Sequence, residues 1–196
     1  MIAESHYYKD DLLHFVRDVR RWLKVARFTE RRWYEFERGL LSSCLCVRRL
    51  VECHKVANEL ASETVEVEVF DGLGKPVTIM NRYDLLELYD VENPKVELRS
   101  IGFVVNQIIH SFVLSYWRNP DRTSITVFFS SDRERNRRAH SISTLHLFQV
   151  FEAFGSDYPD KGHFTYNEAR RDYEITLISS ERVIQRPRSR RRLTKR

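Results

Sequence analysis

The spacing of apolar residues separates a helical first third of the chain from a mixed remainder. In residues 7–28 and 30–60, apolar side chains recur every three or four positions, which is the period of one face of a helix. Thr29 lies between the two segments and is suited to cap the second helix. Because the link is so short, we expect the helices to pack antiparallel and to bury their apolar seams. The seams are Leu12, Phe15, Val19, Trp22 and Ala26 in the first helix and Trp33, Phe36, Leu40, Cys44, Val47, Val51 and His54 in the second.

Residues 93–116 carry the next strong apolar pattern. Asn93 can cap a helix, and Pro94 suits its first position because the N–H that proline lacks would be unpaired there. The pattern predicts a central core helix, and residues 112–117 also fit the alternation of a strand into which this helix can pass. Its apolar seam is Leu98, Ile101, Val105, Ile108 and Phe112, and its opposite face, a second packing surface or a site, is Arg99, Phe103, Asn106 and His110.

A period of two begins at residues 64–70, where valine and glutamate alternate, and it predicts a half-buried strand. Residues 71–74 have the composition of a turn, so residues 77–80 are predicted to return as the partner strand. Asn81 can cap a short helix, and Ser143 can cap a longer one that ends at Gly155. Further strands are predicted at residues 125–129, 139–142 and 173–178, with loops at residues 130–138 and 156–172.

Together these segments predict an α+β fold in one domain, residues 1–181. An N-terminal antiparallel helical hairpin, residues 1–62, is followed by a small, mainly antiparallel sheet with packed helices, residues 63–181. Residues 182–196 form a basic tail that has no means of building a core, so we expect it to be disordered by itself.

The positive charge of the chain is concentrated in that tail. The 196 residues include 33 basic and 28 acidic side chains, which gives a formal net charge of +5. Residues 182–196 contain eight basic residues and no acidic one, which leaves 25 basic against 28 acidic residues, a net charge of −3, in the rest of the chain. The body therefore has no overall attraction for nucleic acid, whereas the tail has.

Composition also limits where in the cell the protein is expected and which cofactors it could bind. No run of 18 apolar residues predicts a membrane span, and the first residues lack the pattern of a secretory signal. The odd number of cysteines, Cys44, Cys46 and Cys53, favours a reduced setting, so we expect a cytoplasmic protein. Cys44 and Cys46 point to different sides of one predicted helix, and paired cysteine motifs and phosphate loops are missing, so neither a metal nor a cofactor is expected.

The leading functional prediction rests on basic residues. Arginine-rich segments neutralise phosphates and fold on RNA, so we predict that the tail binds nucleic acid, with RNA favoured, or an acidic protein partner, without catalysis. Residues 131–138 are expected to form a basic hairpin tip that touches a nucleic-acid backbone, with Trp117 and Tyr116 near it. The predicted binding residues are Arg186, Arg188, Arg190, Arg191, Arg192, Lys195 and Arg196 in the tail and Arg133, Arg135, Arg137 and Arg138 in the tip.

Three short segments place a histidine five residues after an arginine or after the position that an arginine would take. They are Arg49 to His54, Val105-Asn106 to His110, and Arg135-Asn136 to His140. These segments resemble the Arg-to-His motif of ribonucleases of the HEPN superfamily. The resemblance implies a metal-independent endoribonuclease in which a histidine is the general acid or base and an arginine stabilises charge on phosphorus. In this alternative the catalytic residues would be His110, Asn106, His54, Arg49, Arg135 and His140.

A third alternative is a protein-interaction subunit. The helical hairpin would pair with another chain, and a homo-oligomer is one form of this pairing. The exposed arginines near Arg17 and Arg20 would then form the polar rim of the interface.

Overall fold

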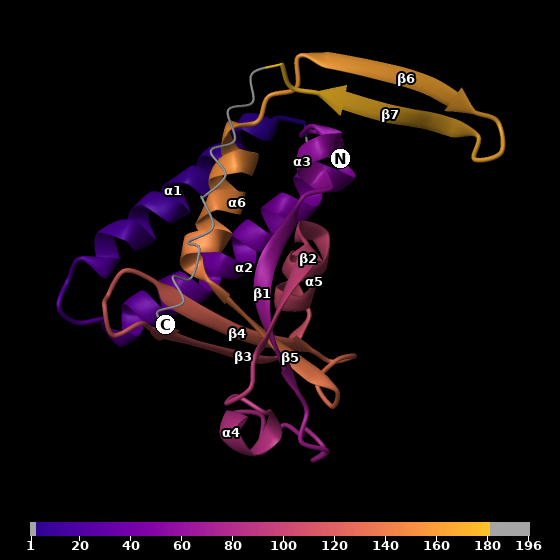
Figure 1. The fold of residues 1–196 in the computed structure, drawn as a ribbon. Helices are drawn as coiled ribbons and strands as arrows, with labels where there is room; N and C mark the ends of the chain where they lie inside the picture. The colour runs from indigo at the N-terminus through magenta and orange to yellow at the C-terminus, as the bar shows by residue number, and fades with distance from the viewer. Residues whose placement is uncertain (1–2, 181–196) are drawn as a thin grey trace, which may run out of the picture.

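The structure, a computed structural model, describes residues 3–180 and has the predicted α+β architecture (Figure 1). The predicted basic tail lies outside the described residues. None of the helices in residues 3–180 is long and apolar enough to cross a membrane. The elements follow in the order α1 (Ser5–Leu23), α2 (Glu30–Glu52), α3 (Asn58–Ala61), β1 (Thr64–Asp71), α4 (Leu85–Leu88), β2 (Lys95–Ser100), α5 (Ile101–Ile109), β3 (Ser111–Arg118), β4 (Ile125–Ser131), β5 (Arg138–Ser143), α6 (Thr144–Ser156), β6 (Lys161–Asn167) and β7 (Asp172–Ile178).

The N-terminal helical hairpin is confirmed, and α1 and α2 pack together as their seams predict. The Thr29 hydroxyl accepts a hydrogen bond from the Arg32 N–H at 3.3 Å and caps α2. The two helices approach closely at Gly39, where a Cβ atom would lie 2.3 Å from the ring of Phe15. Residues 53–57 interrupt the predicted second helix, and α3 completes it as a separate short turn.

The central helix predicted from Asn93 is wrong in its first half. Residues 95–100 form strand β2, and α5 begins only at Ile101, where the Ser100 hydroxyl accepts a hydrogen bond from the Phe103 N–H at 3.2 Å. The spacing of Leu98 fits a helix, but the alternation of residues 95–100 fits a strand equally well, and pairing with β1 decides the outcome. The predicted passage into a strand near residue 112 is confirmed by β3.

Three other predictions also fail. Residues 77–80 form no strand, because β2 and β5 occupy the two sides of β1. Residues 161–167, predicted as loop, form β6 and pair with β7 over seven residues. Asn81 does not cap α4, since its side-chain oxygen accepts a hydrogen bond from the Thr78 N–H at 2.7 Å.

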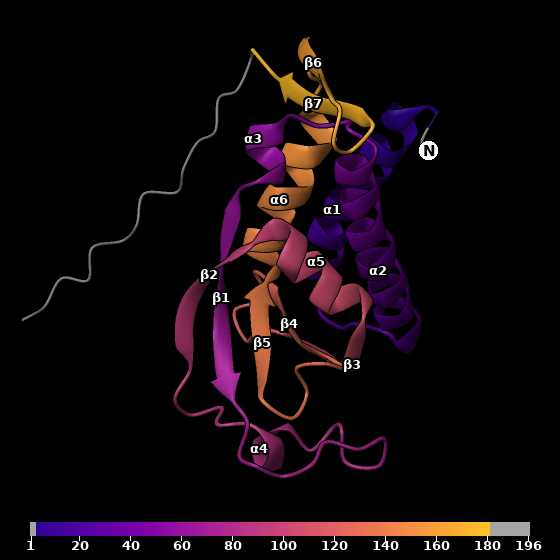
Figure 2. The same ribbon diagram turned by 90° about the vertical axis from the view of Figure 1, so that its right-hand side faces the viewer.

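The main sheet has five antiparallel strands in the order β2-β1-β5-β4-β3, and helices α1, α2, α5 and α6 lie on one of its faces (Figures 1 and 2). That inner face packs on α1, α2, α5 and α6 in one large core. The outer face carries a smaller cluster under the segment that contains α4, formed by Phe70, Val77, Leu88, Tyr89, Val113, Phe128 and Ala139. Strands β6 and β7 form a separate ribbon that extends away from the body (Figure 1).

Candidate functional site

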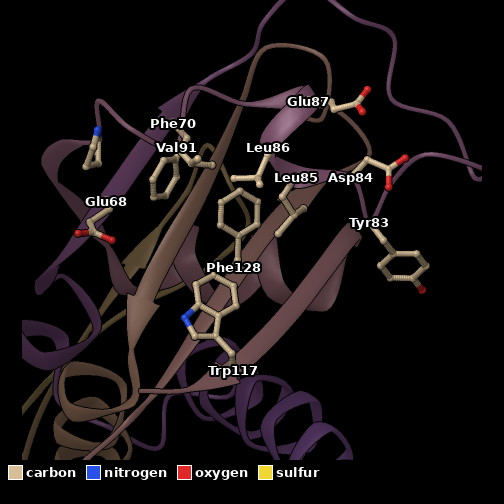
Figure 3. Close-up of a pocket in the computed structure, with 11 residues that line it drawn as sticks. Glu68, Phe70, Tyr83, Asp84, Leu85, Leu86, Glu87, Val91, Trp117 and Phe128 are labelled. Atoms are coloured by element: carbon tan, nitrogen blue, oxygen red, sulfur yellow. The ribbon is translucent and has the colours of Figure 1, made fainter. Parts of the chain in front are cut away.

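The outer face of the sheet contains a groove whose floor is built from three strands (Figure 3). Side chains alternate along a strand, so Glu68 and Phe70 of β1, Phe128 of β4 and Trp117 of β3 face away from the helices. The ring centroids of Phe70 and Phe128 are 5.2 Å apart, and those of Phe128 and Trp117 are 6.3 Å apart. The floor is therefore a row of neighbouring aromatic rings with one carboxylate at its end.

The wall of the groove is the segment around α4, which is fixed to the sheet by Tyr89. The Tyr89 side chain is fully buried, and its hydroxyl donates to the carbonyl oxygen of Arg135 at 2.8 Å. Backbone hydrogen bonds of 2.9 Å, from Leu73 N–H to the Leu88 carbonyl and from Asp90 N–H to the Asp71 carbonyl, hold the same segment. These contacts place Leu85 and Leu86 beside the aromatic floor (Figure 3).

The groove encloses a cavity of about 710 Å³ with an apolar floor and an acidic edge. Among the described residues that line it, Glu68, Asp84 and Glu87 are acidic and none is basic. Glu68 accepts a hydrogen bond from the Ser141 hydroxyl at 2.7 Å, which orients its carboxylate. Glu87 forms an exposed ion pair with Lys75 at 3.0 Å. The volume lies in the range of ligand pockets, and the charges favour a ligand that is positively charged as well as apolar.

Apolar surface continues from the groove onto the edge strand β2. Val96 pairs with Glu68 and Leu98 pairs with Glu66, so all four side chains lie on the outer face. Val96 is 67% exposed and Leu98 is 65% exposed. The far side of β2 pairs with no other strand among residues 3–180. The groove therefore opens onto an elongated surface on which a row of acidic side chains on β1 lies beside a row of apolar side chains on β2.

His140, one of the predicted catalytic residues, lies inside the core. It is completely buried on β5, stacks on Phe129 with ring centroids 5.7 Å apart, and meets the ring of Phe103 edge-on. Neither ring nitrogen has a hydrogen-bond partner among the described residues. Burial, together with Arg99 and Arg138 nearby, lowers the pKa of His140 to about 4. An RNA chain cannot reach this imidazole in the folded protein.

The other histidine segments lie at the surface but are not assembled as the resemblance implies. His54 is exposed in the turn after α2, and the Arg49 guanidinium binds Glu52 at 3.0 Å. His110 ends α5 with Asn106 one turn before it, and its Nε2 lies 3.3 Å from Nη1 of Arg48, an arginine that the motif did not include. Glu52 also binds Arg48 at 2.7 Å, so both arginines of this cluster already pair with one carboxylate.

Three of the four arginines in the predicted basic hairpin tip form ion pairs within it. Arg135 lies 3.4 Å from Asp132, and Arg137 and Arg138 both pair with Glu134, at 3.9 and 3.2 Å. Arg133 is exposed in the same turn. Trp117 and Tyr116 do not join the tip, because they pair with Thr126 and Val127, toward the far end of β4. The seven predicted tail residues, Arg186, Arg188, Arg190, Arg191, Arg192, Lys195 and Arg196, lie outside the described residues.

The groove was not predicted from the sequence. One of its acidic residues, Glu68, belongs to the alternation of valine and glutamate in β1, which predicted only a half-buried strand. The signal that could have drawn attention was Trp117, a large aromatic residue on the polar side of a strand. Comparison with protein-family models, with curated proteins and with solved structures found no match for the chain.

Proposed function

We propose that this is a non-catalytic protein that binds an extended, basic and partly apolar segment of a partner protein in the groove. One observation carries the proposal: a cavity of about 710 Å³ has an aromatic floor and three carboxylates, with no basic residue among its described lining residues. The aliphatic stem of a lysine or arginine can lie on Trp117 and Phe128 while its charged end meets Glu68 or Asp84.

The shape of the surface favours a chain over a compact small molecule. The groove is open and continues along β2 through Val96 and Leu98, beside Glu68 and Glu66. Extended peptides bind exposed sheet edges through their backbone, and alternate side chains then select the sequence. In an extended partner segment with alternating basic and apolar residues, all basic side chains lie on one face, where they would match the row of glutamates on β1.

The test uses the blocked hexapeptide Lys-Val-Lys-Val-Lys-Val and NMR of the three tryptophan indole N–H groups. Trp117 lines the groove, whereas Trp22 and Trp33 pack against the helical core and serve as internal references. We expect a saturable shift of the Trp117 signal alone, at least threefold weaker binding by Glu68→Gln, and no change in Glu168→Gln, whose carboxylate lies at the ribbon tip. Equal binding of a peptide with glutamate in place of lysine would contradict the proposal.

A second proposal concerns residues 182–196, which we propose bind nucleic acid, with RNA favoured, or an acidic protein. Its support is the charge of this segment, with eight basic residues and no acidic one. Changing Arg190, Arg191 and Arg192 to glutamine should weaken binding of labelled single-stranded RNA or duplex DNA and flatten its salt dependence. Unchanged anisotropy titrations would contradict it.

The same incubations test the ribonuclease alternative, for which the contact between Arg48 and His110 is the supporting observation. Cleavage of the RNA that disappears in His110→Ala, in a variant with an unchanged circular dichroism spectrum, would establish a nuclease. Intact RNA at micromolar protein would exclude it. The pairing of the helical hairpin with another chain is disfavoured, because α5, α6 and the sheet already cover the apolar seams.

A further inference from the structure

The ribbon of β6 and β7 has two unlike faces. Seven residue pairs connect the strands, from Lys161 opposite Ile178 to Asn167 opposite Asp172. Because opposed residues share a face, three of these pairs form one apolar face: Gly162 with Leu177, Phe164 with Ile175, and Tyr166 with Tyr173. The other face carries mainly polar pairs, such as His163 with Thr176 and Thr165 with Glu174.

The three aromatic residues of the apolar face are exposed, whereas Ile175 and Leu177 are half-buried. Phe164 is 63%, Tyr166 53% and Tyr173 58% exposed, and the two tyrosine rings contact each other with centroids 5.3 Å apart. No residue of the ribbon belongs to either hydrophobic cluster of the described residues, and the ribbon extends away from the body (Figure 1). A two-stranded ribbon is only marginally stable in water unless a hydrophobic face is covered.

The base of the ribbon is firmly attached to the body. The Asn58 side chain accepts from the Leu177 N–H at 2.7 Å and donates to the Ile175 carbonyl at 3.2 Å. The Asp157 carboxylate accepts from the Ala57 N–H at 2.6 Å and from the Ser179 hydroxyl at 2.7 Å. These contacts fix how the apolar face is presented.

We infer that the apolar face of the ribbon is an interface with a second copy of this chain. A two-fold axis through the middle pair, Phe164 and Ile175, would stack two ribbons face to face. The bulky tip pair of each copy would then cover the base pair of the other, where Gly162 contributes no side chain. A Cβ atom at Gly162 would lie 3.1 Å from the Phe164 ring, so this ring lies close to the backbone of β6. Side chains therefore protrude less from the ribbon at its base than at its tip.

The charges at the two ends of the ribbon are balanced. The tip carries Glu168, Arg170, Arg171 and Asp172, and the base carries Asp160 and Lys161. Neither end has a net charge, so charge repulsion does not oppose the antiparallel stack.

The exposed area predicts a weak dimer. A full aromatic side chain buries about 200 Å², so the exposed fractions of the three rings amount to roughly 350 Å² per copy and about 700 Å² for two copies. Stable interfaces bury about 1,200–2,000 Å², and smaller ones belong to transient contacts. We therefore expect dissociation in the micromolar range or weaker.

Sedimentation velocity of the full chain across micromolar to millimolar concentration tests the inference. We expect a monomer–dimer equilibrium whose dissociation constant rises at least tenfold in Phe164→Asp. Thr165→Asp, the matched change on the polar face of the same strand, should leave it unchanged, as should Glu68→Gln in the groove. A chain that stays monomeric throughout, or equal effects of the Phe164 and Thr165 changes, would overturn the inference.

A charge-exchange pair tests the two-fold arrangement itself. A two-fold axis across the strands places β7 of one copy over β7 of the other, so Tyr173 is expected to face Leu177 of the other copy. Tyr173→Lys and Leu177→Glu should therefore each abolish the dimer. An equimolar mixture of the two folded variants should form a heterodimer, because one contact pairs lysine with glutamate and the other keeps tyrosine with leucine. A mixture that stays monomeric would overturn this arrangement.

Discussion

The groove and the ribbon both leave apolar surface uncovered, but in opposite ways. The groove is concave, bounded by the α4 segment, and edged by Glu68, Asp84 and Glu87. The ribbon face is flat, formed by two strands alone, and fixed only at its base. A concave acidic surface is complementary to something unlike itself, whereas a flat neutral face with self-matching ends is complementary to its own copy. The shape and charge of an uncovered surface therefore indicate its partner better than its area does.

The largest effect should come from Asp157→Ala, which loosens the ribbon and spares the groove. The change removes the acceptor of the Ala57 N–H and the Ser179 hydroxyl, and it removes a negative charge near buried Lys9, which also donates to the Asp157 carbonyl. Burial already lowers the pKa of Lys9, and Asp157 opposes this. We expect a loss of about 3 kcal/mol in the free energy of unfolding, measured with urea.

Hydrogen exchange localises that effect. In Asp157→Ala, amides of β6 and β7 should exchange faster relative to those of β1 and β4. Asp160→Ala, which removes an exposed carboxylate that accepts from the Ser180 N–H at the same end of the ribbon, should change stability far less. Equal loss of protection in the ribbon and the main sheet would show that Asp157 does not act at the ribbon base.

The next effect is a pH dependence of the sheet beneath the groove. The folded pKa of His140, about 4, is below the ordinary value of 6.5, so the unfolded chain binds the proton more readily. The contribution of neutral His140 to the free energy of unfolding is fully present above pH 6.5 and is lost as the pH falls toward 4. We expect a loss of about 3 kcal/mol across this interval, measured by urea unfolding. His140→Phe should flatten the profile, and an unchanged slope would contradict this assignment.

A smaller effect is expected from a substitution that changes the wall of the groove but not the ribbon. Tyr89→Phe removes the hydrogen bond to the Arg135 carbonyl but keeps the ring that contacts Phe128. We expect a loss of about 1 kcal/mol in stability, faster exchange in residues 83–88, and weaker binding of the lysine–valine peptide. The dimerisation constant of the ribbon should not change. A shift in dimerisation would mean that the two surfaces are coupled.

The smallest expected effect is a gain in affinity for the lysine–valine peptide. Lys75→Gln removes the cation that pairs with Glu87 at the edge of the groove. Because this pair is exposed, we expect the lysine–valine peptide to bind only twofold to threefold more tightly at low salt, with no gain at high salt. Calorimetry at two salt concentrations measures the difference. Weaker binding would indicate that Lys75 contacts the peptide directly.

Local patterns predicted the parts of the fold that depend on neighbours in sequence. The seams of α1 and α2, the cap at Thr29 and the helix after Ser143 were all predicted from spacing and capping residues. The segment around Leu98 was mistaken for helix because its spacing suits both periods, and only pairing with β1 selects the strand. Residues 161–167 were predicted as loop, although Gly162, Phe164 and Tyr166 alternate with the other residues of this segment as side chains do in a strand.

The candidate site was less predictable because it is assembled from distant segments. Glu68, Trp117 and Phe128 become neighbours only through the strand order β2-β1-β5-β4-β3, which no local pattern encodes. His140 illustrates the converse, since its spacing from Arg135 resembled a catalytic motif whereas its position on a central strand buries it. A catalytic residue must be accessible to its substrate. The sequence pattern of β5 did not identify which of its side chains would be exposed.

The same strand order bears on the route of folding. Strand β5 pairs with β4, which precedes it by a short turn, and with β1, which is far from it in the sequence. Contacts between residues close in sequence form faster, so the β3–β4–β5 unit can form early, and β1 and β2 join it later. The floor of the groove takes residues from both units and is complete only when they have joined. A peptide that binds there should therefore slow unfolding while leaving the rate of folding almost unchanged. The groove would thus be the last part of the sheet to form during folding and the first to be lost during unfolding.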